Sequence, residues 1–240
     1  MITIPVFHTL EEAFFYCLDM DASLRERLDM FSAVARRLRP AMQDAVDRLV
    51  VRLAATDVGA AAPQVGDPMP DFTLPDERGK LVNLANLLRI GPVAITFHRG
   101  HWCQYCRTNT TALAEAQTKI AAEGAQIVAI MPDCQNFAAA FKAEAKVHYP
   151  ALTDMENGYS LSLNLAGFVG AELQDLIAAS ERDLPRYQGN DSWMLPLQAS
   201  FVVDCDGFVQ ALHRPRLPQA YGDRGSARRS AQGAPPILSW

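Results

Sequence analysis

The spacing of apolar and polar positions predicts helices in the first part of the chain. Two capping boxes, Thr9–Glu12 and Ser23–Glu26, mark helix starts near the N-terminus. After Ser23 the apolar residues recur every three or four positions, as on one face of an amphipathic helix, and the pattern resumes after Pro40. The sequence therefore predicts a helical extension over residues 1–56. Such an extension is suited to packing on a core or to pairing in a homodimer.

Apolar runs of strand length follow a change of composition. Residues 57–71 are rich in Ala, Gly, Pro and Asp, a mixture typical of a linker. The runs over residues 93–97 and 126–131 then predict two buried strands, and the spacing between them predicts a helix over about 103–123. A strand, a helix and a second strand in this order are typical of two parallel strands in one sheet.

The pattern after these strands predicts a further helix and an antiparallel hairpin. The helix is expected over residues 137–146, and an Asp-Gly turn joins two strands into a hairpin over 200–212. We therefore expect an α/β fold over residues 72–213, in which a mixed central sheet with a parallel half and an antiparallel edge is flanked by helices. The segment from about 158 to 193 is interpreted as an insertion.

Composition and charge narrow the class of protein. Of the 240 residues, 49% are hydrophobic and 20% are charged, which excludes global disorder, and a net charge of −5 does not favour a nucleic-acid binder. The sequence has no apolar run of membrane-spanning length and no secretory signal at its start, so we expect a cytoplasmic protein. Residues 214–240 are basic and have no periodicity, which predicts a disordered tail.

The most specific chemical feature is a pair of cysteines. The chain has five cysteines, an odd number that argues against a disulfide scaffold. Cys103 and Cys106 stand where a buried strand passes through a short loop into a helix, and free N–H groups at a helix start stabilise a thiolate. Arg99 is expected to add positive charge there. A zinc site would need two further ligands at suitable spacing, so we favour redox chemistry and expect no metal.

Three segments, taken in order, carry a resemblance to a known family. They are Gly66–Leu74, Arg99–Cys106 and Asn190–Asp204. Together with the helical extension they resemble the peroxiredoxin-like branch of the alkyl hydroperoxide reductase/thiol-specific antioxidant family, over about residues 65–212. The resemblance implies a thioredoxin-like fold. It also implies a thiol-dependent peroxidase that reduces hydroperoxides and is recycled by thioredoxin or a small thiol.

The resemblance leaves the order of the two thiols open. Peroxiredoxin spacing after Phe97 slightly favours Cys106 as the thiol that attacks peroxide, with Cys103 resolving the product. The thioredoxin register and the position at the helix start favour Cys103 as the attacking thiol. In both cases a sulfenic acid condenses with the second thiol to give a Cys103–Cys106 disulfide.

Several positions depart from the family pattern. Gln198 stands where peroxiredoxins carry an Arg that polarises the peroxide, and Asn109 stands where many relatives have Glu. Arg99 is then the remaining source of electrostatic help for cleavage of the O–O bond. We expect Trp102 to shield the cysteine pair and Trp193 to shape the substrate cleft.

These departures leave two alternative functions open. One is a thioredoxin-like protein disulfide oxidoreductase with no peroxide step. The other is a non-enzymatic redox-sensing or interaction protein whose cysteine pair controls assembly through the helical extension. The sequence has no phosphate-binding Gly-rich loop and no dinucleotide fingerprint, so we expect no bound cofactor and an external thiol as the source of electrons.

Overall fold

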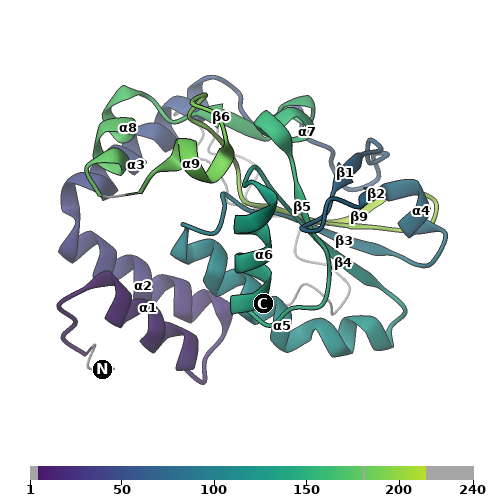
Figure 1. Cartoon of the computed structure of the whole chain (residues 1–240), viewed down its shortest axis with the longest axis horizontal. Helices are drawn as coiled ribbons and strands as arrows, with labels where there is room; N and C mark the ends of the chain where they lie inside the picture. Colours follow the sequence, from purple (N-terminus) through teal and green to yellow (C-terminus); the bar gives the residue numbers. More distant parts are fainter. Residues whose placement is uncertain (1–4, 181, 215–240) are drawn as a thin grey trace, which may run out of the picture.

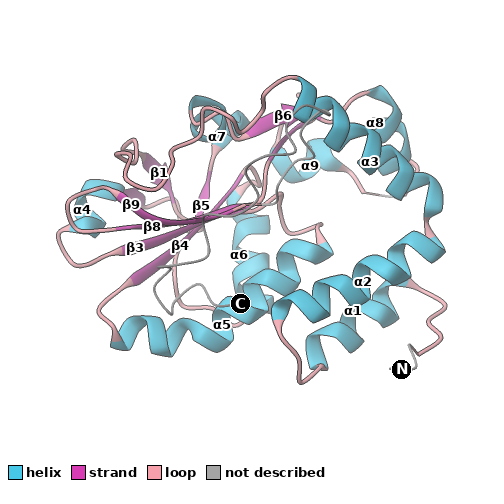
Figure 2. Ribbon diagram, turned by 180° about the vertical axis from the view of Figure 1, so that it is seen from behind, coloured by secondary structure: helices cyan, strands magenta, loops and turns pink. Residues whose placement is uncertain are grey.

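A five-stranded mixed sheet forms the centre of the computed structural model, which describes residues 5–180 and 182–214. The strand order is β5-β4-β3-β8-β9, in which β3, β4 and β5 are parallel while β8 and β9 run antiparallel to their neighbours (Figures 1 and 2). The strands are β3 (Val93–Phe97), β4 (Gln126–Met131), β5 (Ala151–Thr153), β8 (Ala199–Val203) and β9 (Val209–His213). The predicted parallel half and antiparallel edge are therefore confirmed.

Different elements cover the two faces of the sheet. Two helices that connect the parallel strands, α5 (Gln104–Ala122) and α6 (Gln135–Glu144), pack on one face through an apolar cluster that includes Ile127 and Met131. The other face packs against α4, the chain leading into β1, and the residues after α7. These shorter elements are β1 (Thr73–Pro75), β2 (Leu81–Asn83), α4 (Leu84–Leu88), η1 (Met155–Asn157) and α7 (Gly158–Ser162).

The N-terminal extension consists of three helices that dock on the rest of the molecule at two places. They are α1 (Leu10–Asp19), α2 (Leu24–Leu38) and α3 (Pro40–Ala55), and both predicted capping boxes are formed. Figure 1 shows α1 and α2 beside α5, where the rings of Phe31 and Tyr105 meet edge to face at 5.0 Å between centroids. Figure 1 also shows α3 beside α8 (Ala171–Ala178).

Two segments, interpreted from the sequence as a linker and an insertion, are built into the fold. In the stretch interpreted as a linker, Ala62 and Met69 are buried against the sheet. The insertion contains α7, α8 and two further elements, which are β6 (Ala166–Phe168) and α9 (Leu184–Gln188), and β7 (Met194–Pro196) follows it directly. Strands β6 and β7 pair with each other as a separate antiparallel ribbon. This ribbon and α8 form the surface on which α3 packs.

Two further expectations from the sequence concern the C-terminal tail and membrane-spanning helices. The predicted disordered tail, residues 214–240, lies outside the described residues except for Arg214. Among residues 5–180 and 182–214, no helix combines the length and the apolar character that crossing a membrane requires.

Candidate active site

The cysteine pair lies where the loop after β3 turns into α5. Gly100 makes this turn with a φ of +126°, a conformation that residues with a side chain rarely adopt. A Cβ atom at Gly100 would lie 2.3 Å from a carboxylate oxygen of Asp133, in the loop after β4. A glycine therefore lets two loops at the carboxyl end of neighbouring parallel strands approach each other, which brings a buried carboxyl group close to the start of α5.

Cys103 is the residue that caps the start of α5. Its Sγ accepts a hydrogen bond from the backbone N–H of Cys106 at 3.4 Å. Burial opposes ionisation of this thiol, but the hydrogen bond from the Cys106 side chain and the positive charge of Arg99 outweigh it, so the pKa of Cys103 falls from 9.0 to about 6. Arg182 adds a smaller contribution of the same sign. At neutral pH, Cys103 is therefore mainly a thiolate.

Cys106 lies one turn further along α5 and faces the core. Its side chain is fully buried, and its Sγ accepts a hydrogen bond from the backbone N–H of Arg99 at 3.3 Å. Burial raises the pKa of Cys106 well above 9.0, and the neighbouring Cys103 thiolate raises it further. The pKa values of two cysteines three positions apart are thus shifted in opposite directions. Cys106 remains a protonated thiol when Cys103 is ionised.

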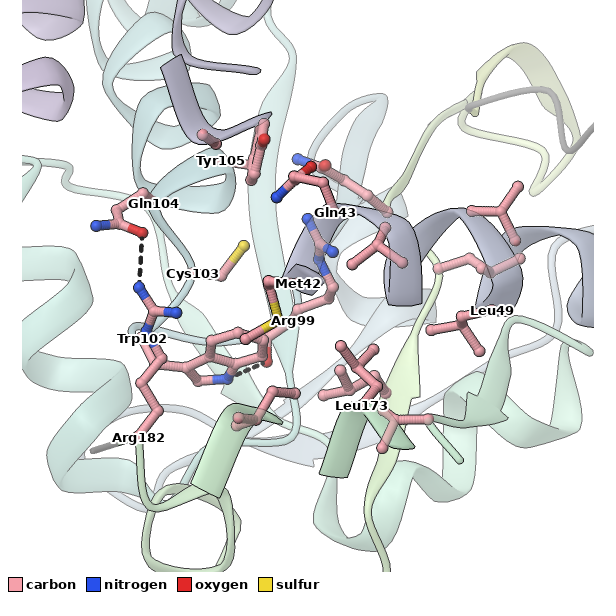
Figure 3. Close-up of a pocket in the computed structure, with 18 of the residues that line it drawn as sticks. Met42, Gln43, Leu49, Arg99, Trp102, Cys103, Gln104, Tyr105, Leu173 and Arg182 are labelled. Carbon is pink, nitrogen blue, oxygen red and sulfur yellow. Dashed lines mark hydrogen bonds between the residues drawn. The ribbon is translucent and has the colours of Figure 1, made fainter. Parts of the chain in front are cut away.

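Two arginines and a tryptophan surround Cys103 (Figure 3). The Cys103 thiolate raises the pKa of Arg99, whose Nε is buried without a hydrogen-bond partner among the described residues. Arg182 donates to the side-chain oxygen of Gln104 at 3.0 Å. The indole N–H of Trp102 donates to the Arg99 carbonyl at 3.0 Å. This bond fixes the ring beside Cys103 and holds the loop that carries Arg99.

Two buried titratable groups near the pair have no signal in the local sequence. Burial lowers the pKa of His98 to about 3, so its imidazole is neutral, and its Nε2 pairs with the Thr96 hydroxyl at 2.8 Å. Burial raises the pKa of Asp133 from 3.8 to about 7, although the backbone N–H of His101 donates to its Oδ2 at 2.7 Å. The pKa shifts of both groups come mainly from burial in the folded protein, which no spacing rule could reveal.

The residues predicted for the site occupy three different environments. Cys103, Arg99, Trp102 and Gln198 line one cavity of about 270 Å³ between α3, α8 and the start of α5. Cys106 contacts Cys103 from the core side and is not part of the cavity lining. Trp193 is buried in the apolar cluster between α3 and α8, behind the cavity wall rather than on it.

The geometry brings together the parts needed for thiol redox chemistry. An ionised thiol faces a cavity, a protonated thiol lies within hydrogen-bonding reach of it, and a guanidinium group is close to both. In the part of the chain that the structure describes, no three His, Cys, Asp or Glu side chains come together as a metal site would require. These features define the class of site: a candidate thiol-disulfide redox centre at a helix start on a mixed α/β fold.

Comparisons with known proteins identify the family. The family model described as "AhpC/TSA family" matches residues 65–212, which is more than half of the chain, so the protein belongs to this family. The resemblance noted in the sequence is thereby confirmed. A search of curated proteins finds no match. The helical extension lies largely before the matched residues.

The chain is also similar to solved structures. The peroxidoxin BcpB of Mycobacterium tuberculosis is similar with a TM-score of 0.51 and 22% identity, over 63% of this chain and 86% of that one. The reduced 2-Cys peroxiredoxin of Plasmodium vivax matches with a TM-score of 0.47 and 19% identity, over 64% of this chain and 72% of that one. The family match and the first of these neighbours confirm the predicted thioredoxin-like fold.

Proposed function

We propose that the protein is a thiol-dependent peroxidase in which Cys103 attacks the hydroperoxide and Cys106 resolves the product. The observation that carries this proposal is the position of the acidic Cys103 thiol on the wall of a cavity, beside Arg99. Cys103 is only 3% exposed, so the cavity is its route to substrate. This order of attack is the reverse of the one that peroxiredoxin spacing slightly favoured. Burial raises the pKa of both thiols, but the hydrogen bond from the Cys106 side chain and the charge of Arg99 lower that of Cys103, whereas Cys103 raises that of Cys106 further.

The proposed reaction has three steps. The Cys103 thiolate attacks the terminal oxygen of R–O–OH, so that an S–O bond forms, the O–O bond breaks and RO⁻ leaves to be protonated as ROH. Cys103 is thereby oxidised to a sulfenic acid. The Cys106 thiol then displaces the hydroxyl of the sulfenic acid, which leaves as water after taking up a proton, and a Cys103–Cys106 disulfide remains. An external dithiol, for which we propose thioredoxin, or two molecules of a small thiol reduce this disulfide through thiol exchange.

The charged side chains around Cys103 support the first step. Peroxide cleavage moves negative charge onto the leaving oxygen, and a guanidinium beside the reacting atoms stabilises that charge. Arg99 is nearer to Cys103 in the chain and lowers its pKa more than Arg182 does. Arg182 lies on the opposite side of the thiol (Figure 3). The structure thus offers two cations near the thiol although Gln198 stands where relatives carry an Arg. A reducing cytoplasm would supply the electrons that recycling needs.

A coupled assay tests this function. Reduced protein is mixed with a hydroperoxide, thioredoxin, thioredoxin reductase and NADPH, and NADPH consumption is followed. We expect turnover in the wild type and none above background in Cys103→Ser. Cys106→Ser should consume one equivalent of peroxide per protein and then stop, because its sulfenic acid has no partner thiol.

The alternatives give different outcomes in the same experiment. Insulin-disulfide reduction without peroxide turnover would favour a protein disulfide oxidoreductase. Neither activity, combined with a change in oligomer size on oxidation, would favour a redox-sensing protein. Consumption of one equivalent of peroxide by Cys103→Ser and of none by Cys106→Ser would reverse the proposed roles of the two thiols.

A further inference from the structure

The cavity that reaches Cys103 extends well beyond the cysteine itself. Most of its lining is apolar, and two helices supply much of it: Met42, Val46 and Leu49 from α3, and Leu173 and Ile177 from α8. Figure 3 shows Met42, Leu49 and Leu173 on this lining. Its volume of about 270 Å³ is close to the lower end of the range for small-molecule sites, about 300–1,000 Å³. A few polar groups at one end of an apolar cavity are typical of a site that binds one organic molecule in one orientation.

The N-terminal extension is responsible for one wall of this cavity. All of the α3 residues that line it precede residue 65, where the match to the family begins. Helix α3 is held in place by the Arg48 side chain, whose Nε donates to Glu172 of α8 at 3.0 Å. Arg52 holds its other end, with a hydrogen bond of 2.6 Å to the Phe168 carbonyl. The extension is therefore fixed as part of the site, and without it Cys103 would face an open surface.

The polar end of the cavity carries positive charge. Four arginines belong to the lining, Arg39, Arg99, Arg182 and Arg214, and no Asp or Glu among the described residues does. Arg214 donates to the Gly59 carbonyl. The other three lie at the Cys103 end, because both Arg99 and Arg182 lower the pKa of that thiol and Arg39 lowers the pKa of Arg182. A ligand that fits both ends needs an apolar body and a polar group able to accept hydrogen bonds.

Hydrogen peroxide can interact favourably only with the polar end of this cavity. It is small and polar, so it gains nothing from apolar walls. An organic hydroperoxide R–O–OH has an oxygen group that suits the arginines and Cys103, and an apolar body that loses its contact with water when it fills the cavity. The two substrate classes therefore differ in the part of the molecule that touches α3 and α8.

On the basis of the proposed function, we propose that this cavity binds the apolar body of organic hydroperoxides and that α3 determines the preference for them over hydrogen peroxide. The body lies between Leu49 and Leu173, and the –OOH group points to Cys103 and Arg99. The terminal oxygen is transferred to Cys103 and the alcohol ROH remains in the cavity as the product, as in the steps above. Residues of the extension thus act as specificity determinants for a thiol that belongs to the family core.

A comparison of two substitutions on α3 tests this assignment. Leu49→Asp places a charge in the cavity wall, whereas Val51→Asp places the same charge two residues away on a side chain that is 62% exposed. Second-order rate constants for oxidation of the reduced protein are measured in single-turnover stopped flow, with cumene hydroperoxide and with hydrogen peroxide. We expect Leu49→Asp to lower the rate for cumene hydroperoxide at least about tenfold more than the rate for hydrogen peroxide. Val51→Asp should leave the ratio of the two rates unchanged.

A second variant covers the case in which Leu49→Asp fails to fold. Val46→Trp fills the cavity with apolar atoms and introduces no charge, and far-UV circular dichroism checks its helix content. It should shift the ratio of rates in the same direction, because the organic body no longer has room. Equal loss for both substrates in both folded variants, or no loss for either, would overturn the assignment.

A binding measurement separates this proposal from the proposed function. The alcohol product of cumene hydroperoxide, 2-phenyl-2-propanol, cannot oxidise a thiol, and we expect it to slow the labelling of Cys103 by iodoacetamide in wild type and in Val51→Asp but not in Leu49→Asp. Protection without any peroxide reaction would contradict the proposed function and support the apolar site. Equal peroxide rates for both substrates without protection would overturn the apolar site and leave the proposed function standing.

Discussion

The start of α5 has a cavity side and a core side, and one cysteine lies on each. Cys103 caps the helix, faces the cavity and is surrounded by Arg99 and Arg182, so its pKa falls to about 6. Cys106 lies among apolar side chains on the sheet, and burial raises its pKa well above 9.0. The comparison shows that the charges and the burial around a thiol set its pKa. Two thiols one helical turn apart can therefore have pKa values shifted in opposite directions.

In the proposed reaction, this difference suits the two thiols to separate chemical tasks. A nucleophile has to be ionised and reachable, and Cys103 meets both conditions. A resolving thiol has to survive until the first thiol has been oxidised, and a protonated, buried Cys106 meets that condition. Once Cys103 becomes a neutral sulfenic acid, its negative charge no longer adds to the effect of burial on the Cys106 thiol, and the pKa of Cys106 falls. The first step therefore prepares the second.

The largest expected effect is the contrast in reactivity between the two thiols. Labelling by iodoacetamide, quantified for each cysteine by mass spectrometry, should be at least about a hundredfold faster at Cys103 than at Cys106 at pH 7, because only the thiolate reacts. The rate at Cys103 should rise through a pKa of about 6 and level off above about pH 7. A rate at Cys103 that continues to rise up to pH 9 would contradict the account of its acidity.

Removal of the positive charge at Arg99 should have the next largest effect. In Arg99→Met, the pKa of Cys103 should rise and its oxidation by peroxide at pH 7 should slow by about tenfold to a hundredfold, because thiolate is lost and the leaving oxygen is less stabilised. Arg99→Lys should recover part of the rate. The control is Arg25→Met, which changes an arginine that is 85% exposed on α2. Equal peroxide rates in Arg99→Met and wild type would remove Arg99 from the proposed site.

A smaller effect is expected from the buried carboxyl group beside the site. The pKa of Asp133 is raised from 3.8 to about 7 in the folded protein, so between these values the folded state holds a proton that the unfolded state has released. Stability therefore falls as pH rises from about 4 to about 7 and gains nothing further above that range. Asp133→Asn removes this contribution and keeps an oxygen for the His101 N–H.

Urea unfolding of both proteins at several pH values measures the effect. The advantage of the wild type over Asp133→Asn should shrink between pH 4 and pH 7, on the order of 2 kcal/mol, because each pKa unit corresponds to about 1.4 kcal/mol and a buried site relaxes in part. Parallel pH profiles for the two proteins would show that Asp133 does not titrate in this range.

The parts of the fold that local chemistry determines could be predicted from the sequence. The capping boxes at Thr9 and Ser23 start α1 and α2, because side chain and backbone pair within four residues. Strands β3 and β4 followed from apolar runs that suit a sheet buried on both faces. Strand β5 is three residues long, and the partner strands β6 and β7 are separated by two helices, so neither had a usable local pattern.

The same distinction applies to the candidate site. Cys103, Cys106 and Arg99 lie within eight residues of each other, and their spacing before a helix revealed them. Arg182 and Asp133 come from distant loops and reach the site only through packing. The apolar face of α3 was predicted, but its partner was not, since an amphipathic pattern shows that a face is buried and not what covers it. The cavity could therefore be found only in the structure.

The central claim is that Cys103 is the thiol that attacks the hydroperoxide. Reduced Cys106→Ser and reduced Cys103→Ser are each mixed with one equivalent of cumene hydroperoxide at pH 7 in the presence of dimedone, which traps sulfenic acids, and the adducts are located by mass spectrometry. We expect a dimedone adduct on Cys103 in Cys106→Ser and, on the same time scale, no adduct on Cys106 in Cys103→Ser. A rapid adduct on Cys106 in Cys103→Ser, with none on Cys103 in Cys106→Ser, would contradict it.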